Sequence, residues 1–225
     1  MSFLLSGRRA DAIPDSGLDH LWWGPSIEDI STFPDEEGDL DATADGNPSL
    51  GSLNDRQAAD YDGVDDSHIT DDSPNFGSDN AYTGVVVIDP SDAGDDDSLY
   101  FSPGSDPSDF GGYSIAIRWS ESSYRVVHAG EGAVSGGTVI NEPQVIVQTF
   151  DGSNVIVDAN GDEQINTSIA APRNPQPQVA IGQRGDGDNY AAGSVGATGH
   201  EATAADANRR DELTNLFADE FDISM

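Results

Sequence analysis

The sequence contains no lysine and no cysteine, and it is poor in basic residues of any kind. Its nine basic residues are all arginines and face 42 aspartates and glutamates, so the formal net charge at pH 7 is −33. The absence of cysteine excludes disulfides and cysteine-ligated metal sites. Arginines are adjacent only at Arg8-Arg9 and Arg209-Arg210. Because phosphate binding needs clustered basic side chains, we expect no nucleic-acid partner.

Long apolar runs are also missing. No run approaches the roughly 20 apolar residues that a membrane-spanning helix needs, so we expect no membrane insertion. The first residues, MSFLLSGRRADAIPDSG, have no positive region before the short FLL, and the sequence therefore predicts no signal peptide.

Hydrophobic residues nevertheless make up 36% of the chain and form clean short runs, which indicates a folded core. A folded, acid-rich chain without lysine suits molar salt, where screening weakens the repulsion between carboxylates. We interpret the source as a haloarchaeon or a virus of one. The alternative is an acidic protein of a mesophile.

Residues 1–55 differ from the rest, because their apolar residues form small clusters between Pro, Gly and acidic residues. This density is too low for an independent core, so we predict a docking arm that ends in an acidic linker near 34–52. Tandem tryptophans exposed on a soluble monomer would be a liability, which favours docking on another subunit. The alternative is that the segment packs back on its own domain. The predicted anchoring residues are Leu18, Leu21, Trp22, Trp23, Ile27, Ile30 and Phe33.

From about residue 56 the chain consists of short runs rich in β-branched and aromatic residues, separated by Asp, Gly, Asn, Ser and Pro. Many short strands with turn residues between them predict an antiparallel sandwich or barrel. Towards the end, Leu213, Leu216, Phe217 and Phe221 fall on one helical face, which predicts a short helix lying on the sandwich. The predicted strands include 83–89, 113–119, 123–129, 144–150, 154–159 and 178–182.

The order of these features resembles the laminin-G-like or concanavalin A-like lectin/glucanase sandwich. YDGVDD (61–66) resembles the opening FDGVDD of that family, TFDGSNVIVDANGDEQ (149–164) resembles a later hairpin, and VAIGQRGDGDNYAAGSVGATG (179–199) resembles a strand and loop. The resemblance implies a mainly β protein, an antiparallel concanavalin A-like jelly roll over residues 56–225 with a short C-terminal helix, preceded by the extended N-terminal arm. The weak, glycine-rich stretch 191–202 departs from the family pattern and leaves the strand pairing open.

No catalytic pattern emerges. Glucanases of this fold place E-x-D-x-x-E on one strand, so that two carboxylates share a face, and no predicted strand has this pattern. The sequence contains no G-x-S-x-G, H-E-x-x-H or phosphate-loop motif, and its four histidines are scattered. The sequence therefore predicts that the protein is not an enzyme.

Two kinds of binding site remain as hypotheses. Calcium needs several converging oxygens, and many sandwiches of this type bind it at an edge loop. In so acidic a chain, aspartate clusters also arise by chance. We expect no required cofactor, with calcium or another hard cation as an optional ligand. Sugar binding combines aromatic rings with Asp, Asn and Arg. The calcium candidates are Asp62, Asp65, Asp66, Asp95, Asp96 and Asp97, and the sugar-binding candidates are Arg184, Asp186, Asp188 and Tyr190.

Together these features predict a surface structural protein of a haloarchaeal virion, a capsid turret, decoration protein or tail spike that attaches to host glycans. Its expected partners are capsid or tail proteins bound through the arm, further copies in a homo-oligomer, and glycans of the host surface. One alternative is a cellular halophilic carbohydrate-binding or adhesin module. Another is a purely structural, capsid-stabilising protein without a ligand.

Overall fold

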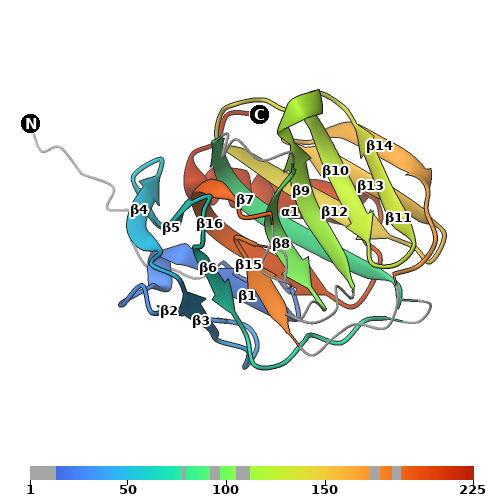
Figure 1. Ribbon diagram of the computed structural model, residues 1–225. Helices are drawn as coiled ribbons and strands as arrows, with labels where there is room; N and C mark the ends of the chain where they lie inside the picture. Colours follow the sequence, from blue (N-terminus) through green and yellow to red (C-terminus); the bar gives the residue numbers. More distant parts are fainter. Residues whose placement is uncertain (1–13, 78–79, 92–96, 105–111, 173–177, 184–188) are drawn as a thin grey trace, which may run out of the picture.

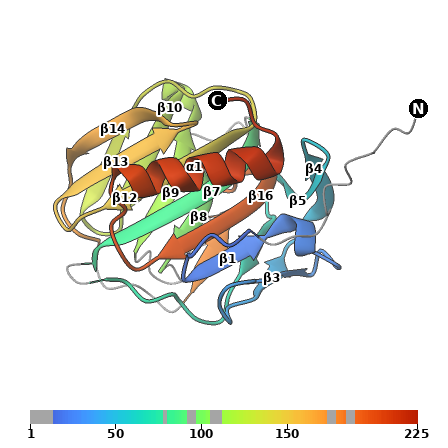
Figure 2. The ribbon, with the colours of Figure 1, turned by 180° about the vertical axis from the view of Figure 1, so that it is seen from behind.

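The computed structural model describes residues 14–77, 80–91, 97–104, 112–172, 178–183 and 189–225. They form two antiparallel sheets packed face to face, with one long helix against the outer face of the first sheet (Figures 1 and 2). The predicted antiparallel sandwich with a C-terminal helix is confirmed. No helix in these ranges is long and apolar enough to cross a membrane.

The first sheet, sheet A, has the strand order β14-β13-β12-β7-β16-β5-β4, and β1 pairs with β16 outside this path. Both faces of sheet A are covered, one by the second sheet and one by the helix. For this reason β7 carries a continuous apolar run instead of alternating residues. The strands are β1 His20–Trp23, β4 Ser49–Leu53, β5 Arg56–Asp62, β7 Tyr82–Ser91, β12 Gln144–Phe150, β13 Asn154–Ala159, β14 Asp162–Ser168 and β16 Ala192–Glu201.

The second sheet, sheet B, has the order β11-β10-β9-β8-β15-β6-β3-β2. Its strands alternate: Tyr113, Ile115 and Ile117 of β9 enter the core between the sheets, while Ser114 and Ala116 face outward. The outer face of sheet B lies on the opposite side of the molecule from the helix (Figure 1). The strands are β2 Thr32–Phe33, β3 Ala42–Asp45, β6 Ser67–Ile69, β8 Asp97–Pro103, β9 Tyr113–Arg118, β10 Ser123–His128, β11 Gly132–Gly136 and β15 Val179–Ile181.

The helix α1, Ala207–Phe221, closes a second hydrophobic core over sheet A. It begins at Asp206, whose side chain accepts a hydrogen bond from the backbone N–H of Arg209 at 2.9 Å and so caps the helix. Leu213, Phe217 and Phe221 are fully buried against the sheet. Figure 2 shows α1 lying across the sheet over β12, β7 and β16.

The predicted docking arm is wrong for the described residues from 14 onward, which belong to the sandwich. β1 pairs with β16 in a register that places His20 opposite His200 and Trp23 opposite Ala197. Neighbouring residues of a strand point to opposite faces, so Trp22 enters the core between the sheets and Trp23 enters the core under α1. Residues 1–13 lie outside the described residues. Of the other predicted anchoring residues, Leu18, Leu21, Ile27 and Phe33 are buried in these cores and Ile30 is half-buried against the first.

The predicted domain boundary after residue 55 is wrong as well, because it falls inside a hairpin. β4 and β5 pair so that Leu53 lies opposite Arg56. The two turn residues, Asn54 and Asp55, both have positive φ angles of 47° and 64°. This is the left-handed conformation of the two-residue turns that suit twisted hairpins. The segment before residue 55 is therefore continuous with the sheets.

The glycine-rich stretch 191–202, which left the strand pairing open, is the central strand β16. It pairs with β7 on one side and with β5 and β1 on the other. Its glycines admit close neighbours: a Cβ at Gly196 would lie 2.4 Å from the Phe221 ring, and one at Gly199 would lie 2.4 Å from Leu18 Cδ1. Phe221 of α1 and Leu18, two residues before β1, fill this space, so neighbouring elements supply the side chains that the strand lacks.

Candidate functional site

Three of the predicted calcium ligands come together in the turn between β5 and β6. The carboxylates of Asp62, Asp65 and Asp66 offer oxygens that all lie within 4.8 Å of one another. Asp66 is buried and accepts hydrogen bonds from the backbone N–H groups of Asn47 at 2.7 Å and Asp62 at 3.2 Å. Converging carboxylate oxygens are the ligand set of a hard cation such as Ca²⁺. We call these three residues the aspartate cluster.

The other predicted calcium ligands do not join the aspartate cluster. Asp95 and Asp96 lie outside the described residues. The Asp97 carboxylate is held by two arginines, with Arg118 Nε and Arg125 Nη1 each at 3.0 Å. The two guanidinium groups neutralise this carboxylate and do not support it as a calcium ligand, so that role of Asp97 stays a prediction.

The start of β16, which follows the loop after β15, lies beside the aspartate cluster. The backbone N–H of Ala191 donates to the carbonyl of Gly182 at 2.7 Å and closes the loop at its base. Ala192, the first residue of β16, lies opposite Asp62. Of the predicted sugar-binding residues, Tyr190 is half-buried in this loop, while Arg184, Asp186 and Asp188 lie outside the described residues.

This loop also borders the outer face of sheet B. The backbone N–H of Leu99 in β8 donates to the carbonyl of Asn189 at 3.2 Å. Leu99 lies opposite Ala116 of β9, and both are buried although they belong to neither hydrophobic core. The outer face of β8–β10 thus combines small and apolar side chains with the arginines beside Asp97. This surface could not be predicted from the sequence, because alternation marks it only as the polar side of the strands.

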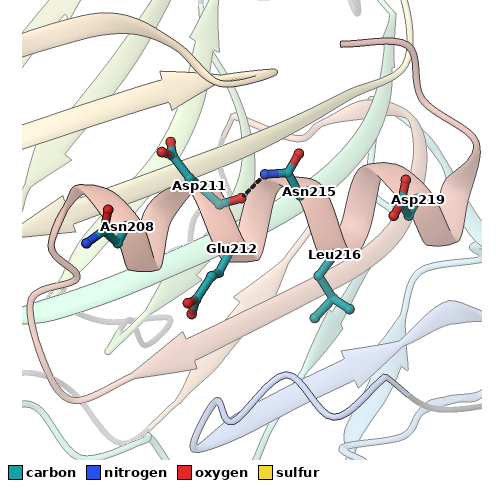
Figure 3. Close-up of a pocket in the computed structure, with 6 residues that line it drawn as sticks. All are labelled: Asn208, Asp211, Glu212, Asn215, Leu216 and Asp219. Carbon is teal, nitrogen blue, oxygen red and sulfur yellow. Dashed lines mark hydrogen bonds between the residues drawn. The ribbon is translucent and has the colours of Figure 1, made fainter.

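A shallow hollow runs along the outer side of α1 (Figure 3). Its lining residues come from one helix face, with Asn215 donating to the Asp211 backbone carbonyl at 2.7 Å. Leu216, predicted to face the sheet with Leu213, is half-exposed here. A surface lined by a single helix cannot enclose a ligand. The lining residues are Asn208, Asp211, Glu212, Asn215, Leu216 and Asp219.

Three of the four histidines are buried and fasten loops to the cores. His68 contacts the Tyr61 hydroxyl at 2.9 Å and the Ile30 carbonyl at 2.7 Å. His128 and His200 make the same kind of pair with a tyrosine hydroxyl and a backbone carbonyl. Burial lowers the pKa of His128 and of His200 to about 4. With both ring nitrogens engaged inside the protein, these side chains are structural.

Comparisons with known proteins identify a fold and no family. No family model matches the sequence, and no curated protein matches it. Among solved structures, a Trypanosoma rangeli sialidase in complex with a difluoro-KDN inhibitor aligns with a TM-score of 0.69 at 14% identity, covering 93% of this chain and 34% of the sialidase chain. The chain thus spans about a third of the sialidase's length.

Two further structures are similar over more of their own length. Domain 4 of a GH43 extracellular arabinanase from Geobacillus stearothermophilus, in complex with arabinotriose, aligns with a TM-score of 0.67 at 15% identity, covering 88% of this chain and 97% of that domain. The receptor-binding domain of a botulinum neurotoxin C/D mosaic serotype aligns with a TM-score of 0.63 at 10% identity, covering 88% of this chain and 51% of the toxin-domain chain. At these identities the likeness shows the β-sandwich fold alone.

The comparisons contradict the prediction that the protein is not an enzyme. That prediction rested on missing motifs, above all on the missing E-x-D-x-x-E strand of glucanases. Sandwiches of this shape nevertheless occur inside a sialidase chain and as a domain of an arabinanase. The missing glucanase motif therefore does not exclude an enzyme.

Proposed function

We propose that this chain is a glycan-binding β-sandwich whose site lies on the outer face of β8–β10, beside the loop between β15 and β16. The observation that carries the proposal is the similarity to a whole arabinanase domain solved with arabinotriose. Two features support this place. The partly exposed Arg118 and Arg125 supply hydrogen-bond donors on this face, and Tyr190 follows Asn189, whose carbonyl accepts from Leu99 of β8, so an aromatic ring lies at its border.

Titration calorimetry with an oligosaccharide panel in molar KCl tests this function. We expect binding of at least one panel member, including arabinotriose as a probe. Replacing Tyr190 by Ala should weaken that binding by about tenfold or more, since a stacked aromatic ring contributes on the order of 1–3 kcal/mol. An unchanged unfolding midpoint would show that the variant is folded. If no oligosaccharide binds, the proposed function is wrong.

We further propose that the aspartate cluster binds Ca²⁺ and holds the β5–β6 turn against the start of β16. A cation that binds only the folded state, present at a free concentration 100 times its Kd, stabilises that state by about 2.7 kcal/mol. We therefore expect Ca²⁺ to raise the unfolding temperature in molar KCl, and a chelator to reverse the rise. Asp66→Asn should abolish this shift.

Asp162→Asn is the matched control for the calcium experiment. Asp162 is an exposed carboxylate in the hairpin between β13 and β14, and its replacement changes the net charge by the same amount. It should leave the calcium-dependent shift intact. A wild-type midpoint that does not respond to Ca²⁺ would contradict the calcium site.

The biological setting stays a prediction. Attachment to a haloarchaeal virion, with capsid or tail partners and a homo-oligomeric spike, was predicted partly from a free docking arm. Trp22 and Trp23 fill the protein's own cores, so they do not support such anchoring. Mass spectrometry of purified haloarchaeal virions would detect the protein if it is a particle component. Its detection on cells alone would favour the cellular adhesin module, and a particle protein without glycan binding would favour the purely structural role.

A further inference from the structure

The strand β4 forms a free edge of sheet A. It pairs with β5 on one side, and no strand in the described ranges pairs with its other side. Figures 1 and 2 show β4 at the rim of the molecule, on the side away from β11 and β14. Ser49, Leu50 and Ser52 are exposed, and the apolar Leu50 side chain is 49% exposed. A free edge of this kind offers unpaired backbone groups to another strand.

The hairpin geometry determines which backbone groups of β4 point outward. Leu53 and Arg56 flank the two-residue turn, so they form a hydrogen-bonded pair. Bonded and non-bonded pairs alternate along an antiparallel ladder, and Gly51 therefore also bonds to β5. Leu50 and Ser52 direct their N–H and C=O groups away from β5. These four groups are half of a further antiparallel ladder.

This edge lacks the features that usually block the addition of a strand. Edge strands are commonly protected by charged side chains, a proline, a bulge or a covering loop. The stretch 46–54, GNPSLGSLN, contains no charged residue in a chain of which 23% is charged. Its proline, Pro48, precedes the strand, and the register of β4 with β5 has no bulge. The edge strand β14, by contrast, begins with Asp162 and Glu163.

The missing charge also indicates which kind of strand pairs here. A basic partner would be attracted by an acidic edge, and a net charge of −33 shows that acidic residues are abundant elsewhere. Two copies of this acidic chain repel each other where their carboxylates meet. The uncharged stretch keeps its bordering residues Asp45 and Asp55 at the ends of the contact, and molar salt screens charges beyond about 3 Å. The charge pattern therefore fits a second copy of the chain.

We propose that two copies of this chain pair through β4 around a two-fold axis and join their A sheets into one continuous sheet. The axis passes beside Gly51, so that Leu50 of one copy lies opposite Ser52 of the other. This antiparallel register uses every outward N–H and C=O group of both strands. The neighbouring two-fold registers use fewer, because they place Ser52 opposite Pro48, which has no N–H, or Leu50 opposite the turn residue Asn54.

Analytical ultracentrifugation of the full chain in molar KCl tests the dimer. A contact between two five-residue strands is smaller than a standard protein interface, so we expect a weak dimer with a Kd of about 10–100 μM. The weight-average mass should rise from 23.6 kDa towards twice that value between about 1 μM and about 1 mM protein. A mass that stays at 23.6 kDa over this range overturns the inference.

Two variants test whether β4 is the contact. Ser52→Pro removes an outward N–H and leaves the ladder between β4 and β5 in place. Leu50→Asp puts a carboxylate on the uncharged edge, and we expect either variant to weaken the dimer about tenfold or more. Ile140→Asp is the matched control, because Ile140 is an apolar residue that is 40% exposed outside β4, and it should leave the dimer intact.

The fold of each variant is checked separately from its assembly. At about 1 μM protein the chain is monomeric under the expected Kd, so the unfolding midpoint reports the fold alone. If Ser52→Pro lowers that midpoint strongly, Leu50→Asp decides, since its side chain is at the surface. A dimer that persists in a folded Leu50→Asp variant, or one that is lost in Ile140→Asp instead, overturns the inference.

Cysteine cross-linking tests the register. The chain has no cysteine, so each introduced thiol reports one position. Opposite residues of a hydrogen-bonded pair have Cα atoms about 5.5 Å apart, which suits a disulfide. An oxidised mixture of Leu50→Cys and Ser52→Cys chains should give mainly the mixed dimer, whereas random proportions of mixed and self-linked dimers would contradict the pairing. None of these experiments contains an oligosaccharide, so their failure leaves the proposed glycan binding standing.

Discussion

Lowering the pH from 7 to about 4 in molar salt is expected to destabilise the protein severely. Three buried histidines are neutral in the folded chain but bind protons in the unfolded chain, so acid favours unfolding. In His68 and His200, Nε2 faces a backbone carbonyl at 2.7 and 2.8 Å, and in His128, Nδ1 does so at 2.7 Å. A carbonyl only accepts, so these nitrogens carry the proton and the opposite nitrogens face tyrosine hydroxyls. The neutral imidazole satisfies both contacts, whereas a second proton would bury a positive charge.

The sign and size of the effect follow from the pKa values. Burial lowers the pKa of His128 and His200 to about 4, and it lowers the pKa of His68 as well. The pKa of histidine in an unfolded chain is about 6.5. Below this pH the histidines of the unfolded chain bind protons, whereas those of the folded chain stay neutral. The contribution of these neutral histidines to the free energy of unfolding is therefore fully present above pH 6.5 and is lost as the pH falls towards 4. Each of the two strongly shifted histidines contributes roughly 3 kcal/mol to this loss.

Denaturant unfolding at a series of pH values in molar KCl measures this dependence. His128→Gln provides the control, since it cannot titrate: it should be less stable at pH 7.5 and should show a shallower loss between pH 6.5 and 4. A free energy of unfolding that stays constant over this range would contradict neutral, structural histidines.

The Asp35 carboxylate, which the fourth histidine contacts, titrates in a lower pH range. His20 contacts the Asp35 carboxylate at 2.6 Å. Burial alone would raise the pKa of Asp35, but hydrogen bonds from His20 and from the backbone of Leu21, Leu40 and Gly38 outweigh it and lower this pKa below the usual 3.8. The stability that Asp35 contributes is thus lost only below about pH 3.8, which lies under the range from pH 6.5 to 4 in which the histidines act.

Trp23→Ala is expected to reduce the free energy of unfolding by about 3–5 kcal/mol, the usual cost of emptying a buried aromatic site. Trp23 is 1% exposed and packs edge-on against Phe221, with ring centroids 5.1 Å apart, and against Phe217 at 6.3 Å. Removing it opens a cavity between β1 and α1, two elements at opposite ends of the described chain. A tryptophan used for docking on another protein would give a different result, since its removal would leave the isolated protein stable.

Leu50→Ala is the control for this experiment. Leu50 is also apolar and lies in sheet A, but it is 49% exposed. Its truncation should cost well under 1 kcal/mol, within the range of ordinary surface substitutions. Equal, small effects of Trp23→Ala and Leu50→Ala in denaturant unfolding would contradict the burial of the N-terminal strand.

Much of the sandwich could be predicted where the residues alternate or form β-branched runs. The predicted strands 144–150 and 154–159 coincide with β12 and β13, and the run 113–119 contains β9. Such runs signal strands because their own side chains fill the core. The strand β16 escaped prediction for the opposite reason, since the side chains that pack on its glycines belong to α1 and to the residue Leu18 before β1.

The two adjacent tryptophans were assigned to a docking arm because the apolar residues of 1–55 are too sparse for a core of their own. A strand with one buried face alternates, whereas Trp22-Trp23 places two large apolar residues next to each other. Sheet A is covered on both faces, so both residues are buried. The candidate site shows a similar limit. The aspartate cluster was found because its members are neighbours in sequence, whereas Asp97, Arg118 and Arg125 come from three strands and meet only through their register.

The position of β16 has a consequence for the time course of folding. This strand joins β7, β5 and β1, and it pairs His200 with His20 across most of the chain. Sheets whose central strand comes late bring together distant segments, and chains of high contact order fold slowly. During synthesis, β5 and β7 wait with open edges until residues 192–201 leave the ribosome, which makes this interval the one in which aggregation competes with folding.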